Sequence, residues 1–350
     1  MGGILIMDDL VINSSTREYS VKFKAFSCTD LVQNNTNVYL IDENVMNLHN
    51  EKFEKLPRNR CIIFNSTEDN KELSGVDYVI SRLLALGANR KTTLVCIGGG
   101  IIQDIGCFVA QIFMRGISWV FYPTTLLSQA DSCIGSKSSI NFSNIKNLIG
   151  SFYAPFQIVI DVAFLNTLPE HEIESGIGEI YKINLISGVG LNKKLLINKN
   201  IPENDIVEII KTALQQKKAI IEKDEFDTSS RLVMNYGHTI GHALEIASNH
   251  QIPHGIAVSI GLNTANYLGK IYSNSTHYDK YNAIIRPKEE KVYLDFVDFE
   301  LFKNAFEADK KHTKKDYCII FPVKNKVSIN YISKNTEIIN EIVDFLKGCN

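Results

Sequence analysis

Short apolar runs alternate with helical stretches between about residues 37 and 161. Each run is continuously apolar, which is typical of strands that are buried on both faces of a parallel sheet. Helical spacing at residues 76–86, and in a second segment that ends near Arg115, supplies the intervening helices. The runs cover residues 38–42, 61–65, 93–98, 119–123 and 158–161. This part of the chain therefore predicts an α/β domain with a parallel sheet.

From Pro169 to about Leu268 the apolar period becomes helical. We expect four helices there, at residues 170–186, 205–222, 235–247 and 254–268. The tail returns to two short strands, at 317–322 and 327–331, and ends in a helix from Asn335. The pattern predicts two domains, residues 1–165 with the sheet and residues 166–350, which are mainly helical.

Length and composition agree with this division and narrow the range of partners. A chain of 350 residues exceeds the size at which a single core stops growing. A net charge of -2 and a pI near 6.5 argue against a nucleic-acid or anionic-membrane partner. The seven cysteines form no CxxC pair, no run reaches transmembrane length, and the first ten residues lack a basic signal-peptide region. We expect a cytoplasmic protein that acts on a small molecule.

Three histidines in the helical half form a candidate metal site. His238 and His242 are four residues apart, so both rings lie on one face of a helix, and His254 follows shortly after. Imidazole is a common ligand of divalent metals, and a zinc site needs a third protein group while one position stays open. The pair lacks the glutamate of an HExxH motif, and such pairs are structural about as often as they bind metal. The third histidine, together with Arg231 and Asn235 nearby, favours a site.

A triple glycine at residues 98–100 follows a predicted strand and precedes an apolar helix. Glycines let the backbone approach a pyrophosphate, and a helix N-terminus favours its charge. The strict GxGxxG pattern fails because Gln103 stands at its third glycine, and a triple glycine is as often only a tight turn. Asp42, after an earlier strand, is placed to bind a ribose hydroxyl. A nucleotide loop and a plain turn both remain open.

A polar stretch at residues 123–147 carries Asp131, Lys137 and Lys146 among several hydroxyl side chains. Such groups orient a small polyhydroxylated anion. The alternative is a solvated polar loop, but the apolar flanks of the stretch favour burial. We therefore expect a buried, glycine-bearing binding loop.

Taken together, the motifs resemble the dehydroquinate synthase family of sugar-phosphate cyclases. They are GGGIIQD, FMRG, PTTLLSQADSCIGSK, KNLIGSFYAP, TLPEHE, GIGEIYK and NYGHTIGHALE, followed by HG. The similarity runs from about Asp42 to His254, with a weaker echo at residues 309–311. It implies an N-terminal Rossmann-like NAD-binding domain, a C-terminal, mainly helical metal-binding domain, and a homodimer.

The resemblance also implies roles for individual residues. The metal, zinc or alternatively cobalt, would be held by Glu179, His238 and His254, which leaves His242 to act on the substrate. Adenosine-side contacts would come from Asp42, Asn44, Glu68 and Lys71, and the pyrophosphate loop from Gly99, Gly100 and Ile101. Asp104 would lie at the carboxamide end of NAD, with Thr124, Thr125, Lys146 and Thr167 along the cofactor. Substrate positions would be Asp131, Lys137, Asn147, Lys182, Lys217, Arg231 and Asn235, with Lys310 or Lys311 and a dimer-crossing Arg115 at the phosphate.

The implied reaction converts 3-deoxy-D-arabino-heptulosonate 7-phosphate to 3-dehydroquinate and phosphate in the shikimate pathway. NAD would be regenerated in each turnover, so the enzyme would be a lyase. Alternatives are cyclases that form 2-deoxy-scyllo-inosose, epi-valiolone or amino-dehydroquinate, a glycerol-dehydrogenase-like oxidoreductase, and a non-catalytic metal-binding protein. Arg231, Asn235 and Lys137 favour a substrate with a carboxylate. The departures from the family pattern are Gln103, Ser136, Ser138 and Ser139.

Overall fold

The computed structural model describes residues 9–143, 145–191 and 202–348. Two compact units divide the chain, the first formed by residues 1–168 and 203–226 and the second by residues 169–202 and 227–350. The chain therefore crosses between units more than once, in place of the single boundary at 165/166 that the sequence suggested. The expectations that concern the first eight residues and Cys349 lie outside the described residues. No described helix has the length and hydropathy needed to span a bilayer.

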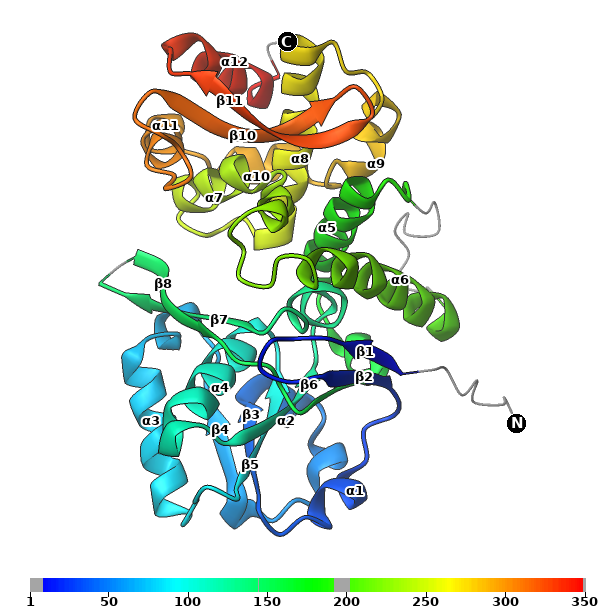
Figure 1. The fold of residues 1–350 in the computed structure, drawn as a ribbon, viewed down its shortest axis with the longest axis vertical. Coiled ribbons are helices and arrows are strands. Elements are labelled where there is room, and N and C mark those ends of the chain that lie inside the picture. The colour runs from blue at the N-terminus through cyan, green and yellow to red at the C-terminus, as the bar shows by residue number, and fades with distance from the viewer. Residues whose placement is uncertain (1–8, 144, 192–201, 349–350) are drawn as a thin grey trace. The chain divides into compact units, whose positions relative to one another are not determined.

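The first unit is built on a seven-stranded sheet (Figure 1). The strands follow the order β1-β2-β9-β6-β5-β3-β4, and all neighbouring pairs are parallel except β1 with β2. Their bounds are β1 Leu10–Ile12, β2 Tyr19–Phe23, β3 Asn37–Asp42, β4 Cys61–Phe64, β5 Thr93–Gly98, β6 Ser118–Pro123 and β9 Gln157–Ile160. The five apolar runs are thus confirmed as parallel strands, and every residue of β3 is buried, as continuous apolar runs require. The strands β1 and β2 were not predicted.

Helices and a hairpin complete the first unit. The helices are α1 Cys28–Val32, α2 Glu43–Leu48, α3 Leu73–Ala85, α4 Gly100–Ile112 and α6 Glu203–Ile221. The polar stretch that was expected to be a loop contains a π-helical turn, Ser128–Ser132, and then an antiparallel hairpin of β7 Lys137–Phe142 and β8 Ile145–Phe152. The expectation of a loop was wrong for the hairpin, although the π-helical turn is buried as expected.

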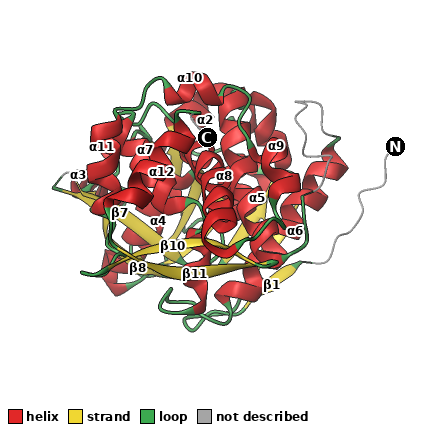
Figure 2. Ribbon diagram, turned by 90° about the horizontal axis from the view of Figure 1, so that it is seen from above, coloured by secondary structure: helices red, strands yellow, loops and turns green. Residues whose placement is uncertain are grey.

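The second unit is mainly helical and has one described strand pair (Figure 2). The helices are α5 Glu170–Ser187, α7 His238–Ala247, α8 His254–Ser273, α9 Asn282–Ile285, α10 Glu290–Leu294, α11 Phe299–Glu307 and α12 Thr336–Leu346. The strands β10 Asp316–Val323 and β11 Lys326–Ser333 pair antiparallel. The predicted helices and strand pair are confirmed, except that residues 235–237 precede α7 and do not belong to it.

Glycines bring α5 and α8 together. A Cβ at Gly178 would collide with the carbonyl oxygen of Gly255, and one at Gly255 would collide with that of Ser175. Only hydrogen atoms fit at this crossing, so the two helix backbones can approach closely. The neighbouring residues Glu179 and His254 are carried into proximity by this contact.

Candidate active site

The three histidines gather where α7 and α8 begin, with His242 one turn into α7. His238 is the first residue of α7 and follows Gly237, whose φ of 78° lies in the left-handed region. His254 is the first residue of α8. One nitrogen from each of His238, His242 and His254 can be chosen so that all three lie within 4.8 Å of one another. The predicted clustering of these rings is therefore present in the second unit.

Glu179 brings a carboxylate to this cluster from α5. Its side chain is buried, with 1% of the residue exposed. Its Oε1 lies 3.1 Å from Nε2 of His254 and 3.6 Å from Nε2 of His238. Lys182, one turn further along α5, forms an ion pair with Oε2 of the same carboxylate. Glu179, His238 and His254 thus converge through one carboxylate oxygen and two ring nitrogens.

Hydrogen bonds fix the orientation of two of the rings. Nδ1 of His238 lies 3.2 Å from the carbonyl oxygen of Tyr236, and Nδ1 of His254 lies 3.2 Å from Oε2 of Glu245. Both partners only accept hydrogen bonds, so each Nδ1 carries the proton and Nε2 faces the cluster. Within the described residues the ring of His242 has no such partner. This contrast supports the ligand set Glu179, His238 and His254 over the His238–His242 pair.

Protonation in the cluster follows burial and the neighbouring charges. Burial, together with Lys182, lowers the pKa of His238 well below its ordinary value, and burial lowers the pKa of His242 to about 4. Burial alone would also lower the pKa of His254, but the carboxylates of Glu245 and Glu179 outweigh it and raise that pKa to about 10. The cluster thus holds a positive charge at its centre, and a divalent cation would take the place of this proton.

The donor set fits a divalent metal ion. One carboxylate and two imidazoles with oriented Nε2 atoms match the three protein ligands of a catalytic zinc site, which leaves a position open. Glu245 and the Tyr236 carbonyl supply the outer hydrogen bonds that such histidines usually make.

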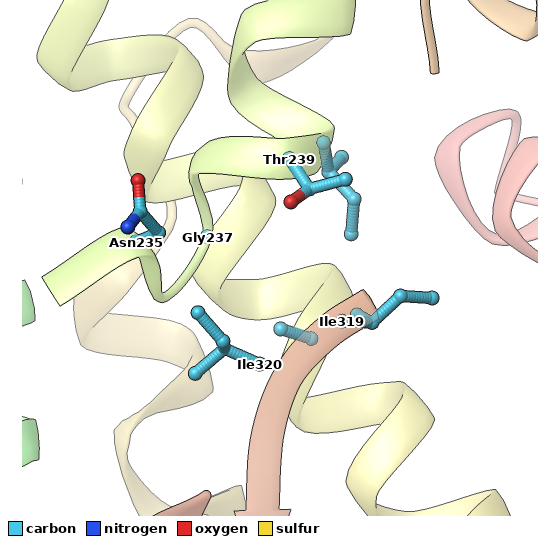
Figure 3. A pocket seen from close by; sticks show the side chains of 7 residues that line it. Asn235, Gly237, Thr239, Ile319 and Ile320 are labelled. Atoms are coloured by element: carbon cyan, nitrogen blue, oxygen red, sulfur yellow. The ribbon is translucent and has the colours of Figure 1, made fainter. Parts of the chain in front are cut away.

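Two predicted substrate residues, Arg231 and Asn235, lie in the 3-10 turn Ser230–Asn235, which precedes His238 in the sequence. Arg231 is buried, with 6% of the residue exposed, and Asn235 donates from Nδ2 to the carbonyl oxygen of Leu232 at 3.1 Å. Asn235 also borders a small pocket (Figure 3). The lining residues are Asn235, Gly237, Thr239, Ile240, Ala265, Ile319 and Ile320. Because no histidine or carboxylate lines it, this pocket is distinct from the metal cluster.

The predicted phosphate lysines lie in the turn between α11 and β10. Lys311 pairs with Asp309 at 2.6 Å. Their charges both influence the pKa of His242, so this turn lies near the histidine cluster. His312 anchors the turn: its Nδ1 accepts from the backbone N–H of Cys318 at 3.0 Å, and its Nε2 therefore donates to the carbonyl oxygen of Phe306 at 2.9 Å. Lys310 has no described contact that bears on its predicted role.

In the first unit the glycine loop lies at the carboxyl ends of adjacent parallel strands. Gly98 ends β5 opposite Pro123 of β6, and the N–H of Thr124 donates to the Gly98 carbonyl oxygen at 3.0 Å. Gly99 caps α4 without a side-chain hydrogen bond, so the first N–H groups of that helix face outward. The Thr124 hydroxyl is buried and has no hydrogen-bond partner among the described residues. An uncapped helix N-terminus and an unpartnered hydroxyl fit a dinucleotide's pyrophosphate.

A network beside this loop joins residues that were assigned to different ligands. Lys71 contacts Asp104 at 2.6 Å and Asn147 at 2.8 Å. The backbone N–H of Ser139 donates to Asp104 at 2.9 Å, and its hydroxyl donates to Asn147 at 2.8 Å. Burial raises the pKa of Asp104, an effect that Lys71 and Ser139 oppose. The ion pair places Lys71 beside Asp104. Their separate roles at the adenosine and carboxamide ends of NAD stay predictions.

Several other predicted cofactor residues have local partners. Asp42 caps α2 by accepting from the N–H groups of Asn44 and Val45. Glu68 accepts from Asn141 at 2.8 Å and lies 3.9 Å from Lys146. Thr167 hydrogen-bonds to His49 at 2.9 Å. Gly100 and Ile101 begin α4, and Thr125 bonds to Ser128.

Asp131 and Lys217 form a buried pair within the first unit. Lys217 Nζ lies 2.5 Å from Oδ1 of Asp131 and donates to its backbone carbonyl at 2.8 Å. The π-helical turn supplies Asp131 and α6 supplies Lys217. Lys137 begins β7 on the surface. Arg115, also exposed, has φ of 67°, and the structure describes no partner subunit for it to reach.

Sequence reasoning missed the residues that orient others. Glu245 lies seven residues after His238 and three after His242, so helical spacing alone places it on the histidine face. Tyr236 acts through its backbone carbonyl and His312 through its ring, and Gln103 was noted only as a departure from the glycine pattern. No sequence signal identifies these three roles.

The first unit has a parallel sheet with a glycine loop at its strand ends, and the second unit has a buried carboxylate–histidine cluster. A solved structure of 2-deoxy-scyllo-inosose synthase, complexed with carbaglucose-6-phosphate, NAD+ and Co2+, has this fold. Its TM-score is 0.83 at 24% identity, over 96% of this chain and 99% of that one.

The sequence comparisons identify the family. The patterns described as 3-dehydroquinate synthase N-terminal and C-terminal match residues 61–175 and 176–312. The 3-dehydroquinate synthase of Pelagibacter ubique is 34% identical, over 89% of this chain and 91% of its own length. That of Saccharolobus solfataricus is 36% identical, over 77% and 79%. The chain belongs to the 3-dehydroquinate synthase family, and the resemblance seen in the motifs is confirmed.

Proposed function

We propose that this enzyme converts 3-deoxy-D-arabino-heptulosonate 7-phosphate to 3-dehydroquinate and phosphate, with NAD and a divalent metal, zinc or cobalt, as its cofactors. The observation that carries the proposal is the position of Glu179, whose Oε1 lies 3.1 Å and 3.6 Å from the Nε2 atoms of two oriented histidines in a chain of this family. The related 2-deoxy-scyllo-inosose synthase was solved with NAD+ and Co2+, which supports both cofactor types.

Each unit would hold one cofactor. In the first unit the uncapped end of α4, the Thr124 hydroxyl and the Lys71–Asp104 pair would hold NAD. In the second unit Glu179, His238 and His254 would hold the cation. When bound, NAD supplies reversible hydride transfer and the cation supplies Lewis acidity at the oxygens of the carbon that is oxidised.

The protein's own groups would then bind and orient the substrate. His242 is neutral at physiological pH, because burial keeps its pKa near 4, so it can accept or donate a hydrogen bond at the leaving phosphate. Lys311 lies in a turn that is anchored by His312 and lies near His242, which suits a phosphate contact.

Recognition of a carboxylate distinguishes the proposed substrate from those of sister cyclases. Arg231 offers a planar fork that matches a carboxylate bidentately, and Lys137 offers a point charge. A carbohydrate phosphate without a carboxylate would not offer the buried Arg231 guanidinium this ligand. The retention of Arg231 and Asn235 in one turn therefore favours the keto-acid phosphate.

Phosphate release and product identity test the proposal. The purified protein, loaded with NAD and zinc or cobalt, is given the seven-carbon keto-acid phosphate, glucose 6-phosphate or sedoheptulose 7-phosphate. We expect phosphate and 3-dehydroquinate from the first substrate only, without net NADH. Faster turnover of either sugar phosphate, or stoichiometric NADH, would contradict the proposal. We further propose that the enzyme is a cytoplasmic homodimer, which sedimentation analysis and cell fractionation would test.

A further inference from the structure

Gln103 and Ser132 hydrogen-bond to each other in both directions. Gln103 Nε2 donates to the backbone carbonyl of Ser132 at 2.7 Å, and the Ser132 hydroxyl donates to Oε1 of Gln103 at 2.6 Å. Gln103 lies in the first turn of α4, and only 5% of it is exposed. Both polar ends of this amide are therefore used to join α4 to the π-helical turn.

This turn is held from two sides. On one side, Lys217 Nζ contacts Asp131, the residue before Ser132: it lies 2.5 Å from the Asp131 carboxylate and 2.8 Å from the Asp131 backbone carbonyl oxygen. Gln103 holds the next residue, Ser132, through its carbonyl and its hydroxyl. The wide turn closes through the Cys133 N–H and the Ser128 carbonyl oxygen at 3.1 Å. π-Helical turns are uncommon and often occur at functional sites, so contacts that fix the shape of this turn are expected to affect function.

Gln103 also belongs to the helix that begins at the glycine loop. Its backbone N–H donates to the carbonyl oxygen of Gly99 at 3.1 Å, and the next residue is Asp104, which pairs with Lys71. A glutamine in the place of the third glycine of a nucleotide loop thus connects the proposed cofactor site to Ser132, the residue after Asp131.

We propose that Gln103 is a positioning residue, which links the cofactor-bearing end of α4 to the turn that presents Asp131. This inference rests on the proposed function, in which Asp131 contacts the substrate. The side chain of Gln103 itself would touch neither cofactor nor substrate. It sets the position of the Asp131 carboxylate relative to the N-terminus of α4.

The variant Gln103→Met tests this role because it keeps the length and volume of the side chain and removes both hydrogen bonds. A buried carbonyl without its donor is costly, so the turn should shift. In the NAD- and metal-loaded enzyme we expect kcat with the keto-acid phosphate to fall roughly tenfold, while the NAD dissociation constant changes less than about twofold. A purely structural role would lower Tm and leave kcat per folded enzyme unchanged, which would overturn the proposal.

Two further variants sharpen the test. Gln111→Met makes the same replacement further along α4, at a residue with no described side-chain contact, and should leave kcat unchanged. The pair Gln103→Met and Ser132→Ala should be non-additive, since Gln103→Met already removes the hydroxyl hydrogen bond that Ser132→Ala removes. Fully additive losses in kcat would overturn the coupling.

Hydrogen exchange separates this inference from the proposed function. In Gln103→Met the backbone amide of Cys133 should exchange faster than in the unmodified protein, whether or not the keto-acid phosphate is the substrate. Unchanged exchange would refute the link between Gln103 and the turn. An unmodified enzyme that releases no phosphate would refute the proposed function alone.

Discussion

Replacement of Glu245 by alanine tests how the metal ligands are oriented. The change removes the carboxylate that lies 3.2 Å from Nδ1 of His254 and leaves the ring free to rotate or to adopt the other tautomer. Loss of such an outer hydrogen bond typically weakens metal affinity 10- to 100-fold, or about 1.4 to 2.8 kcal/mol. We expect Glu245→Ala to fall in this range for zinc, measured by competition with a chromogenic chelator.

His242→Ala is the matched control, because His242 lies on the same face of α7 and has no described orienting partner. It should keep zinc affinity within about threefold of the unmodified protein, whereas His254→Ala should lose the ion. The reasoning fails if His242→Ala releases zinc while Glu245→Ala retains it. That result would restore the paired-histidine site as the correct interpretation.

Three other predictions address separate parts of the molecule. Asp104→Ala leaves the buried Lys71 without the carboxylate that it pairs with, so NAD affinity should fall at least about tenfold in equilibrium dialysis. Unchanged affinity would show that Asp104 does not belong to the cofactor site. Arg231→Ala should lower kcat/KM for the keto-acid phosphate by roughly a hundredfold or more, and Arg231→Lys should recover little of it, because the fork is lost; full recovery by lysine would contradict bidentate binding. Burial raises the pKa of both Cys107 and Cys133 to about 12 from an ordinary value near 9, so the folded state favours the protonated thiols. Between pH 9 and pH 12 the free energy of unfolding should therefore fall by about 1.4 kcal/mol per pH unit for each thiol. Urea unfolding at pH 8 and pH 10.5 measures this loss, which should be smaller in Cys107→Ala; equal losses would refute the assignment.

The predicted elements were those whose apolar pattern matches the period of their structure. The five parallel strands are continuous apolar runs because both of their faces are buried, and the helices of the second unit repeat near 3.6 residues. Hairpin β7–β8 was not predicted because Ser138, Ser139 and Asn141 have low strand propensity. Its first strand is held by contacts distant in sequence, such as the N–H of Ser139 on Asp104 at 2.9 Å.

The metal cluster was recognisable in part. Two histidines four residues apart must share a helix face, whatever the fold. The choice between His242 and His254 as a ligand depends on what lies behind each ring, and for His254 that is Glu245. Glu179 reaches the cluster only through the close approach of α5 and α8 at Gly178 and Gly255, a tertiary contact that no local pattern contains.

Helix α6 shows why the division into two domains could not be drawn at one position. Its helical period resembles that of the segments around it, yet Glu203–Phe226 belongs to the unit that contains the sheet. Helix α6 packs on the π-helical turn, where its Lys217 pairs with the buried Asp131 at 2.5 Å. Removal of one partner from a buried ion pair costs about 3 to 5 kcal/mol, a large share of a typical folding free energy. Residues 1–168 alone would lack the cation that pairs with Asp131, so the sheet unit depends on a segment that follows α5 in the sequence.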